Sequence, residues 1–116
     1  MANPEGLLQA ARALGEAIAS SKVLQNLQAV EKRIDADEAA RKLRDAHREM
    51  AVKVARLEAE GKPVEPEQKR ALAALIDQLR SNPLFQELLR CQVEYETLMR
   101  QVNEAIAGAL RKQSQG

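Results

Sequence analysis

One segment, residues 82–111, constrains the fold of this chain more than any other. It reads as a single helix of thirty residues, because an apolar stripe recurs along it at alternating spacings of three and four. The stripe consists of Leu88, Cys91, Tyr95, Leu98, Val102, Ala105 and Ala109, widened by Phe85, Met99, Ile106 and Leu110. Such a helix spans roughly 43 Å, whereas a compact chain of this length is about 35 Å across. We therefore expect a second chain, or a long hairpin partner, to cover its end.

The apolar residues favour an all-α fold. They are nearly all aliphatic, with twenty Ala and fifteen Leu against one Phe, one Tyr and no Trp, and Ala and Leu lead the scale of helix propensity. We expect an antiparallel bundle of about five helices, two of them long, that dimerises through the long C-terminal helix. A length of 116 residues indicates one domain, which we place at 1–112, followed by a polar tail at 113–116.

Capping residues predict where the other helices begin and end. Prolines that follow a polar residue mark helix starts at Pro4, Pro66 and Pro83, and Ser20-Ser21 marks a break between the first two helices. Gly61 is predicted to end the third helix in the left-handed conformation. Further predicted caps are Asp35, paired with Glu38 in a capping box at the start of the third helix, and Asn82 at the start of the last.

The charge balance argues against nucleic acid as a partner. Eighteen basic and seventeen acidic residues leave no net field, and the most basic-looking segment, 36–60, carries six charges of each sign. Pairs four residues apart, Glu38 with Lys42 and Glu49 with Lys53, are expected to stabilise its helix. We interpret this segment as a solvated helix face.

No group of residues in the sequence indicates a catalytic, metal-binding or cofactor-binding site. His47 is the only histidine and is expected at the edge of the core, with no nucleophile near it in sequence. Cys91, the only cysteine, lies on the apolar stripe and is expected to pack as a small hydrophobe. Capping accounts for the acidic cluster of Asp35, Asp37 and Glu38. The sequence predicts no enzyme, catalytic residue, metal or cofactor.

The chain carries no sign of export. A single cysteine forms no internal disulfide, and no apolar segment has the length of a signal peptide or a membrane span. We expect a cytoplasmic protein with no membrane partner.

Short motifs along nearly the whole chain resemble those of the YlbF/YmcA family of small bacterial helical proteins, which includes YheA-like members. The specificity comes from the order and spacing of pieces that are individually weak. They are Leu14-Gly15-Glu16-Ala17-Ile18 before Ser20-Ser21, Asp35-Ala36-Asp37-Glu38-Ala39, Gly61-Lys62, Ser81-Asn82-Pro83 and Val102-Asn103-Glu104-Ala105-Ile106.

The resemblance implies a self-associating helical domain that serves as a regulatory subunit. It implies a complex with other YlbF/YmcA-type proteins and with the endoribonuclease RNase Y in messenger RNA maturation, connected to competence, sporulation and biofilm formation. Some members have additional cysteines linked to iron–sulfur binding, whereas this chain has only Cys91.

Three functions compete at this point. The first is a homo-oligomeric, non-enzymatic adaptor that acts through protein–protein contacts. The second is a nucleic-acid-binding accessory protein, which neutrality and the scarcity of aromatics disfavour. The third is an enzyme whose site forms between subunits. For the first, the predicted oligomer or partner interface consists of Tyr95, Leu98, Met99, Val102, Ile106 and Leu110.

Overall fold

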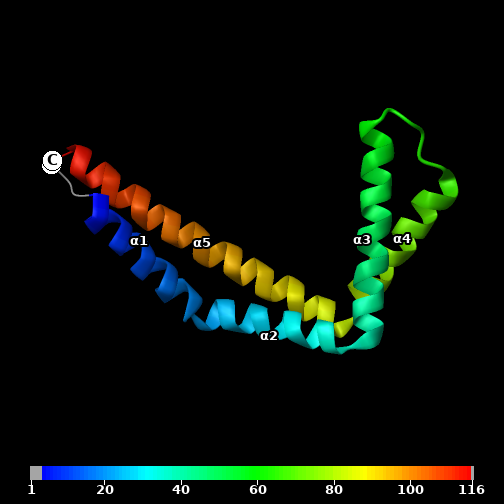
Figure 1. The fold of residues 1–116 in the computed structure, drawn as a ribbon, viewed down its shortest axis with the longest axis horizontal. Helices are drawn as coiled ribbons and strands as arrows, with labels where there is room; N and C mark the ends of the chain where they lie inside the picture. The colour runs from blue at the N-terminus through cyan, green and yellow to red at the C-terminus, as the bar shows by residue number, and fades with distance from the viewer. Residues whose placement is uncertain (1–3, 116) are drawn as a thin grey trace. The chain divides into compact units, whose positions relative to one another are not determined.

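The computed structural model describes residues 4–115, and this part of the chain contains five helices and no strand (Figure 1). The helices are α1 (Pro4–Ala19), α2 (Lys22–Ala36), α3 (Glu38–Ala59), α4 (Pro66–Ser81) and α5 (Pro83–Gln115). The predicted all-α fold with five helices is confirmed. α5 has thirty-three residues, more than predicted, because it continues through the polar residues after Arg111.

The helices group into two compact units. We call the first the terminal unit: it contains α1, α2 as far as Ala29, and α5 from Arg90 onwards. The second, the hairpin unit, comprises Val30–Leu89. Each unit is described by itself.

The hairpin unit is built around α3 and α4, which pack side by side and run in opposite directions (Figure 1). Val30 and Ile34 of α2 and Ala40 of α3 are buried, with exposed fractions of 2%, 1% and 0%. The facing stripes of the hairpin are half-buried: Leu43, Met50, Val54 and Leu57 on α3, and Leu72, Leu75, Ile76 and Leu79 on α4. The hairpin thus has an apolar seam with few fully buried side chains.

The predicted helix ends are largely confirmed. Gly61 has a φ of 70°, the left-handed conformation that glycine adopts without steric cost. Asn82 ends α4 and also caps α5, since its Oδ1 accepts a hydrogen bond of 2.9 Å from the Leu84 N–H. Ser21 caps α2 by accepting one of 3.3 Å from the Leu24 N–H.

The predicted cap of α3 was wrong by two residues. Asp37 is the cap, because its Oδ1 accepts a hydrogen bond of 2.9 Å from the Ala40 N–H. Asp35 lies inside α2, where its carboxylate accepts a hydrogen bond from Arg44 instead. Both aspartates precede helix formers, and only the fold shows which of them leaves the helical conformation.

The terminal unit has very little core of its own. Figure 1 shows α1 running alongside the C-terminal part of α5. Within the described residues of this unit only Leu27 and Cys91 are buried, at 8% and 3% exposure, and α1 contains no buried residue. The prediction that Cys91 packs in the core is confirmed.

Candidate interaction surface

The predicted interface residues all lie on α5, in the terminal unit. Four of them, Tyr95, Leu98, Met99 and Val102, are half-buried. The last two, Ile106 and Leu110, are 47% and 67% exposed. We call these six residues the α5 stripe. The rest of the chain therefore covers the α5 stripe less completely towards the C-terminal end of α5.

An open hollow lies along one side of the stripe. It has a volume of about 550 Å³, and α5 alone lines it, with Tyr95, Glu96, Met99, Arg100, Asn103, Glu104 and Ala107. The hollow brings together two of the predicted residues, Tyr95 and Met99, and leaves the other four outside its lining. A lining that combines apolar side chains with charges of both signs is typical of a surface that receives a protein segment.

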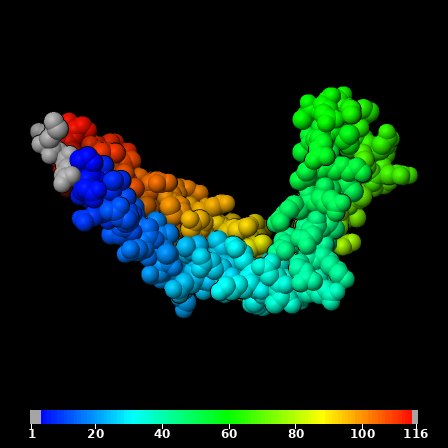
Figure 2. Space-filling model, viewed as in Figure 1, coloured from blue at the N-terminus to red at the C-terminus, as the bar shows by residue number. Residues whose placement is uncertain are grey.

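α1 adds apolar surface that the sequence analysis did not assign to the interface. Leu7, Leu8 and Leu14 are 70%, 48% and 37% exposed, and Figure 2 shows α1 along the surface of the terminal unit in that view. We call these three residues the α1 surface. The helical spacing of the leucines was visible in the sequence, but the same spacing would also arise from burial within the chain.

The remaining side chains offer little for catalysis. His47 is half-buried on α3, as predicted, and the described residues include no group of three or more His, Cys, Asp and Glu placed to hold a metal ion. The hydrogen bond to Asp35, supported by a second of 3.2 Å to Asp45, raises the pKa of Arg44 above its usual value. A permanently charged arginine here serves to fix two carboxylates.

Among residues 4–115, no helix has the length and apolar character needed to cross a membrane.

Comparisons with known proteins give the family of the chain and proteins that share its all-α fold. A family model described as control of competence regulator ComK, YlbF/YmcA, matches residues 7–111. The fold is similar to that of Bacillus subtilis RicA, solved in complex with RicF, with a TM-score of 0.81 and 21% identity over 96% of this chain and 98% of that chain. It is also similar to a protein of unknown function (DUF964) from Bacillus stearothermophilus, with a TM-score of 0.72 and 18% identity over 91% and 93% of the two chains. No curated protein matches the chain.

Proposed function

The chain belongs to the YlbF/YmcA family, which is linked to the control of competence, and from this membership we propose that it is a non-enzymatic adaptor that acts by binding other proteins. RicA, which shares the fold, was solved in complex with RicF. We extend that mode of action, protein–protein assembly, to this chain.

The uncovered apolar surface of the terminal unit carries the proposal. Leu7 on α1 and Leu110 on α5 are both about two-thirds exposed, and burying such a side chain contributes roughly 1.5–3 kcal/mol. Both helices expose their apolar residues along several turns. A soluble chain gains free energy when another chain covers such a surface.

We propose that the α5 stripe and the α1 surface form the interface, and that the partner is a second copy or another YlbF/YmcA-type protein.

At the finer level we propose, from the resemblance, that the assembled oligomer acts with RNase Y in messenger RNA maturation in the cytoplasm. The adaptor would then influence competence, sporulation or biofilm formation through the enzyme that it accompanies. The family's link to competence supports this proposal.

Sedimentation equilibrium at micromolar concentration tests the assembly, with Ile106→Asp as the disruptive variant. We expect the wild type to be at least a dimer. An unpaired carboxylate buried at an interface costs roughly 3–5 kcal/mol, and a two-fold interface contains it twice. Ile106→Asp is therefore expected to weaken the dimer at least a hundredfold, while circular dichroism shows unchanged helix content.

Val93→Asp is the matched control. Val93 is 52% exposed, close to Ile106 at 47%, and lies on a different side of α5, thirteen residues away along the helix. We expect this variant to keep the wild-type mass. A wild-type mass of 12.8 kDa, or equal dissociation of both variants, would refute the assignment of the interface to the α5 stripe.

A further inference from the structure

A second surface lies on α3, within the hairpin unit. One hollow, of about 560 Å³, is lined by Asp45, Arg48, Glu49, Val52, Lys53 and Arg56. A second, of about 410 Å³, is lined by Arg44, His47, Arg48, Ala51, Val52 and Ala55. The two hollows share Arg48 and Val52, so they form one continuous surface along residues 44–56, about 18 Å of helix. We call it the α3 surface.

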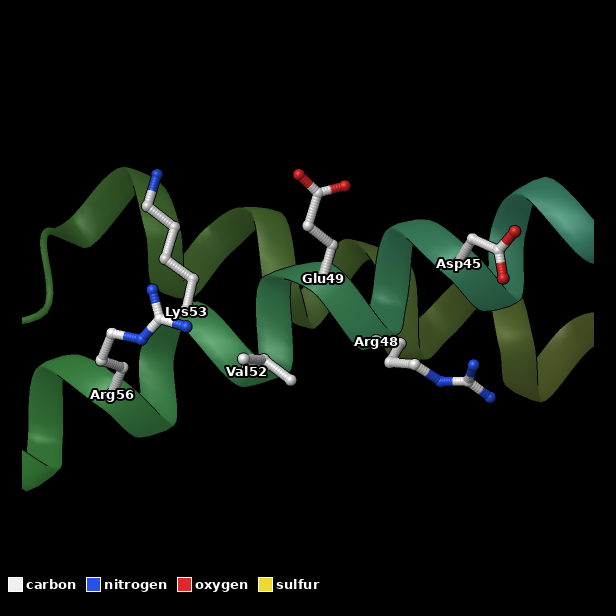
Figure 3. Close-up of a pocket in the computed structure, with 6 residues that line it drawn as sticks. All are labelled: Asp45, Arg48, Glu49, Val52, Lys53 and Arg56. Carbon is white, nitrogen blue, oxygen red and sulfur yellow. The ribbon is translucent and has the colours of Figure 1, made fainter.

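The side chains of the first hollow are displayed away from the neighbouring helix. Figure 3 shows all six projecting from α3, with the ribbon of α4 passing behind it. Val52 lies in the middle of the row and is 51% exposed. Arg48 lies on one side of Val52 along the helix, and Lys53 and Arg56 on the other (Figure 3).

The ion pairs of α3 leave this surface with an excess of available cations. Arg44 pairs with both Asp35 and Asp45. Among the described residues, the lining cations Arg48, Lys53 and Arg56 form no ion pair, and of the lining carboxylates only Glu49 forms none, so unpaired cations outnumber unpaired carboxylates by three to one. The predicted pair of Glu38 with Lys42 is present at 2.9 Å, but the predicted pair of Glu49 with Lys53 is not, which corrects the sequence analysis.

The centre of the surface suits a close-packed helix. Ala51 and Ala55 have side chains of a single carbon, and they flank the exposed Val52 in the second hollow. Small residues on a helix surface allow a second helix to approach closely and bury apolar area along both. Cations at the edge of such a contact would favour a partner helix that places carboxylates opposite them.

We propose that the α3 surface binds an amphipathic α-helix of a partner protein that carries an acidic flank. Its apolar stripe packs on Val52 and the two alanines, and its carboxylates pair with Arg48, Lys53 and Arg56. This inference rests on the proposed adaptor function, since an adaptor that self-associates through the terminal unit needs another surface for its client. Two carboxylates in the lining, Asp45 and Glu49, disfavour a polyphosphate backbone, and neither hollow has a Phe, Tyr or Trp side chain to stack a base.

The test uses two fluorescent peptides of about 18 residues, roughly five helical turns, with the same composition. One places glutamates along the edge of a leucine and alanine stripe, and the other is a scrambled sequence without helical amphipathicity. Fluorescence anisotropy is measured at about 0.1 M salt, where charges interact over about 10 Å. We expect the amphipathic peptide to bind the wild type and the scrambled peptide to bind at least tenfold more weakly.

Charge reversal then locates the site. The double variant Arg48→Glu with Arg56→Glu is expected to bind the amphipathic peptide at least tenfold more weakly, or about 1.4 kcal/mol. The control, Lys69→Glu with Arg70→Glu, makes the same change of charge at two exposed residues of α4. It is expected to stay within about twofold of the wild type, as exposed charges away from a contact do.

Three results would overturn the proposal: equal binding of the scrambled peptide, equal loss in the two double variants, or tighter binding of a single-stranded RNA than of the amphipathic peptide. Arg48→Gln with Arg56→Gln, which adds no acidic group, provides the same test if the reversed variant does not fold. The mass of each sample separates this inference from the adaptor proposal. A monomer that binds the peptide contradicts self-association alone, and a dimer that does not bind it contradicts the α3 surface alone.

Discussion

Asn82→Ala tests how the chain passes from α4 into its longest helix. Asn82 is half-buried, and within residues 4–115 its side chain forms one hydrogen bond, which it accepts from the Leu84 N–H at 2.9 Å. Its main chain has others: the N–H donates to the Leu79 carbonyl at 3.2 Å, and the carbonyl accepts from the Gln86 N–H at 3.0 Å. Alanine removes the first bond and keeps the other two.

The expected loss of unfolding free energy follows from these hydrogen bonds of Asn82. Asn82 has extended backbone angles, φ −86° and ψ 123°, which alanine also adopts before a proline, so no strain is added. Pro83 has no N–H to satisfy. The variant therefore loses one capping bond, for which we expect about 1 kcal/mol of unfolding free energy, equivalent to a Tm lower by about 4 °C in a chain of this size.

Thermal unfolding followed by circular dichroism measures the effect, with all samples at one protein concentration because association shifts Tm. Asn82→Asp is the control. It retains an acceptor oxygen and adds a negative charge at the positive end of α5, so we expect a Tm at or slightly above that of the wild type. If the alanine variant unfolds at the wild-type temperature, Asn82 does not cap α5 and the reasoning from the single bond fails.

The other predictions concern the core, the turn and the surface, and each is read in the same unfolding assay. Ile34 is the largest fully buried side chain described, so Ile34→Ala is expected to cost about 3 kcal/mol and Ile34→Val about 1 kcal/mol; equal effects would mean that the site collapses around either residue. Gly61→Ala puts a Cβ at a φ of 70° and is expected to cost about 1 kcal/mol, whereas Gly15→Ala, inside α1 with open space around it, is expected to stabilise by about 0.5–1 kcal/mol. Arg33 pairs with Glu87 at 2.9 Å but is 58% exposed, so Arg33→Ala is expected to change stability by no more than about 1 kcal/mol, and a larger loss would indicate that the pair is shielded from water.

The sequence predicted the helix boundaries well because capping is local. Pro66 suits the start of α4 because it has no N–H to satisfy and a fixed φ, while Gly61 and Asn82 form hydrogen bonds to residues within one turn. These effects depend little on the rest of the fold. The exception, Asp35 for Asp37, has the same origin. Two aspartates two residues apart can each cap; in the fold Asp37 is the cap, and Asp35 accepts a hydrogen bond from Arg44, nine residues further along.

The sequence was less informative about which stripe residues are covered. Helical spacing identified a common face for Leu98, Val102 and Ile106 equally, yet the first two are half-buried and the third is 47% exposed. Periodicity reports which side of a helix is apolar, whereas cover depends on how far the neighbouring helices reach. For the same reason the exposed leucines of α1 were not recognised as candidate interface residues.

The net charge of residues 36–60 does not show where the charged side chains of this segment lie in the fold. Six acidic and six basic residues cancel in the sequence, and this argued for a uniformly solvated face. In the fold, Arg44 forms ion pairs with Asp35 of α2 and with Asp45, and Lys42 pairs with Glu38 near the start of α3. The ion pairs therefore gather at the first half of α3, while Arg48, Lys53 and Arg56 line the hollow in its middle and second half, together with the single unpaired carboxylate of Glu49. A segment with no net charge can therefore still form a cationic surface on one helix. The net charge depends only on the number of charged residues, whereas ion pairing depends on which of them are neighbours in space.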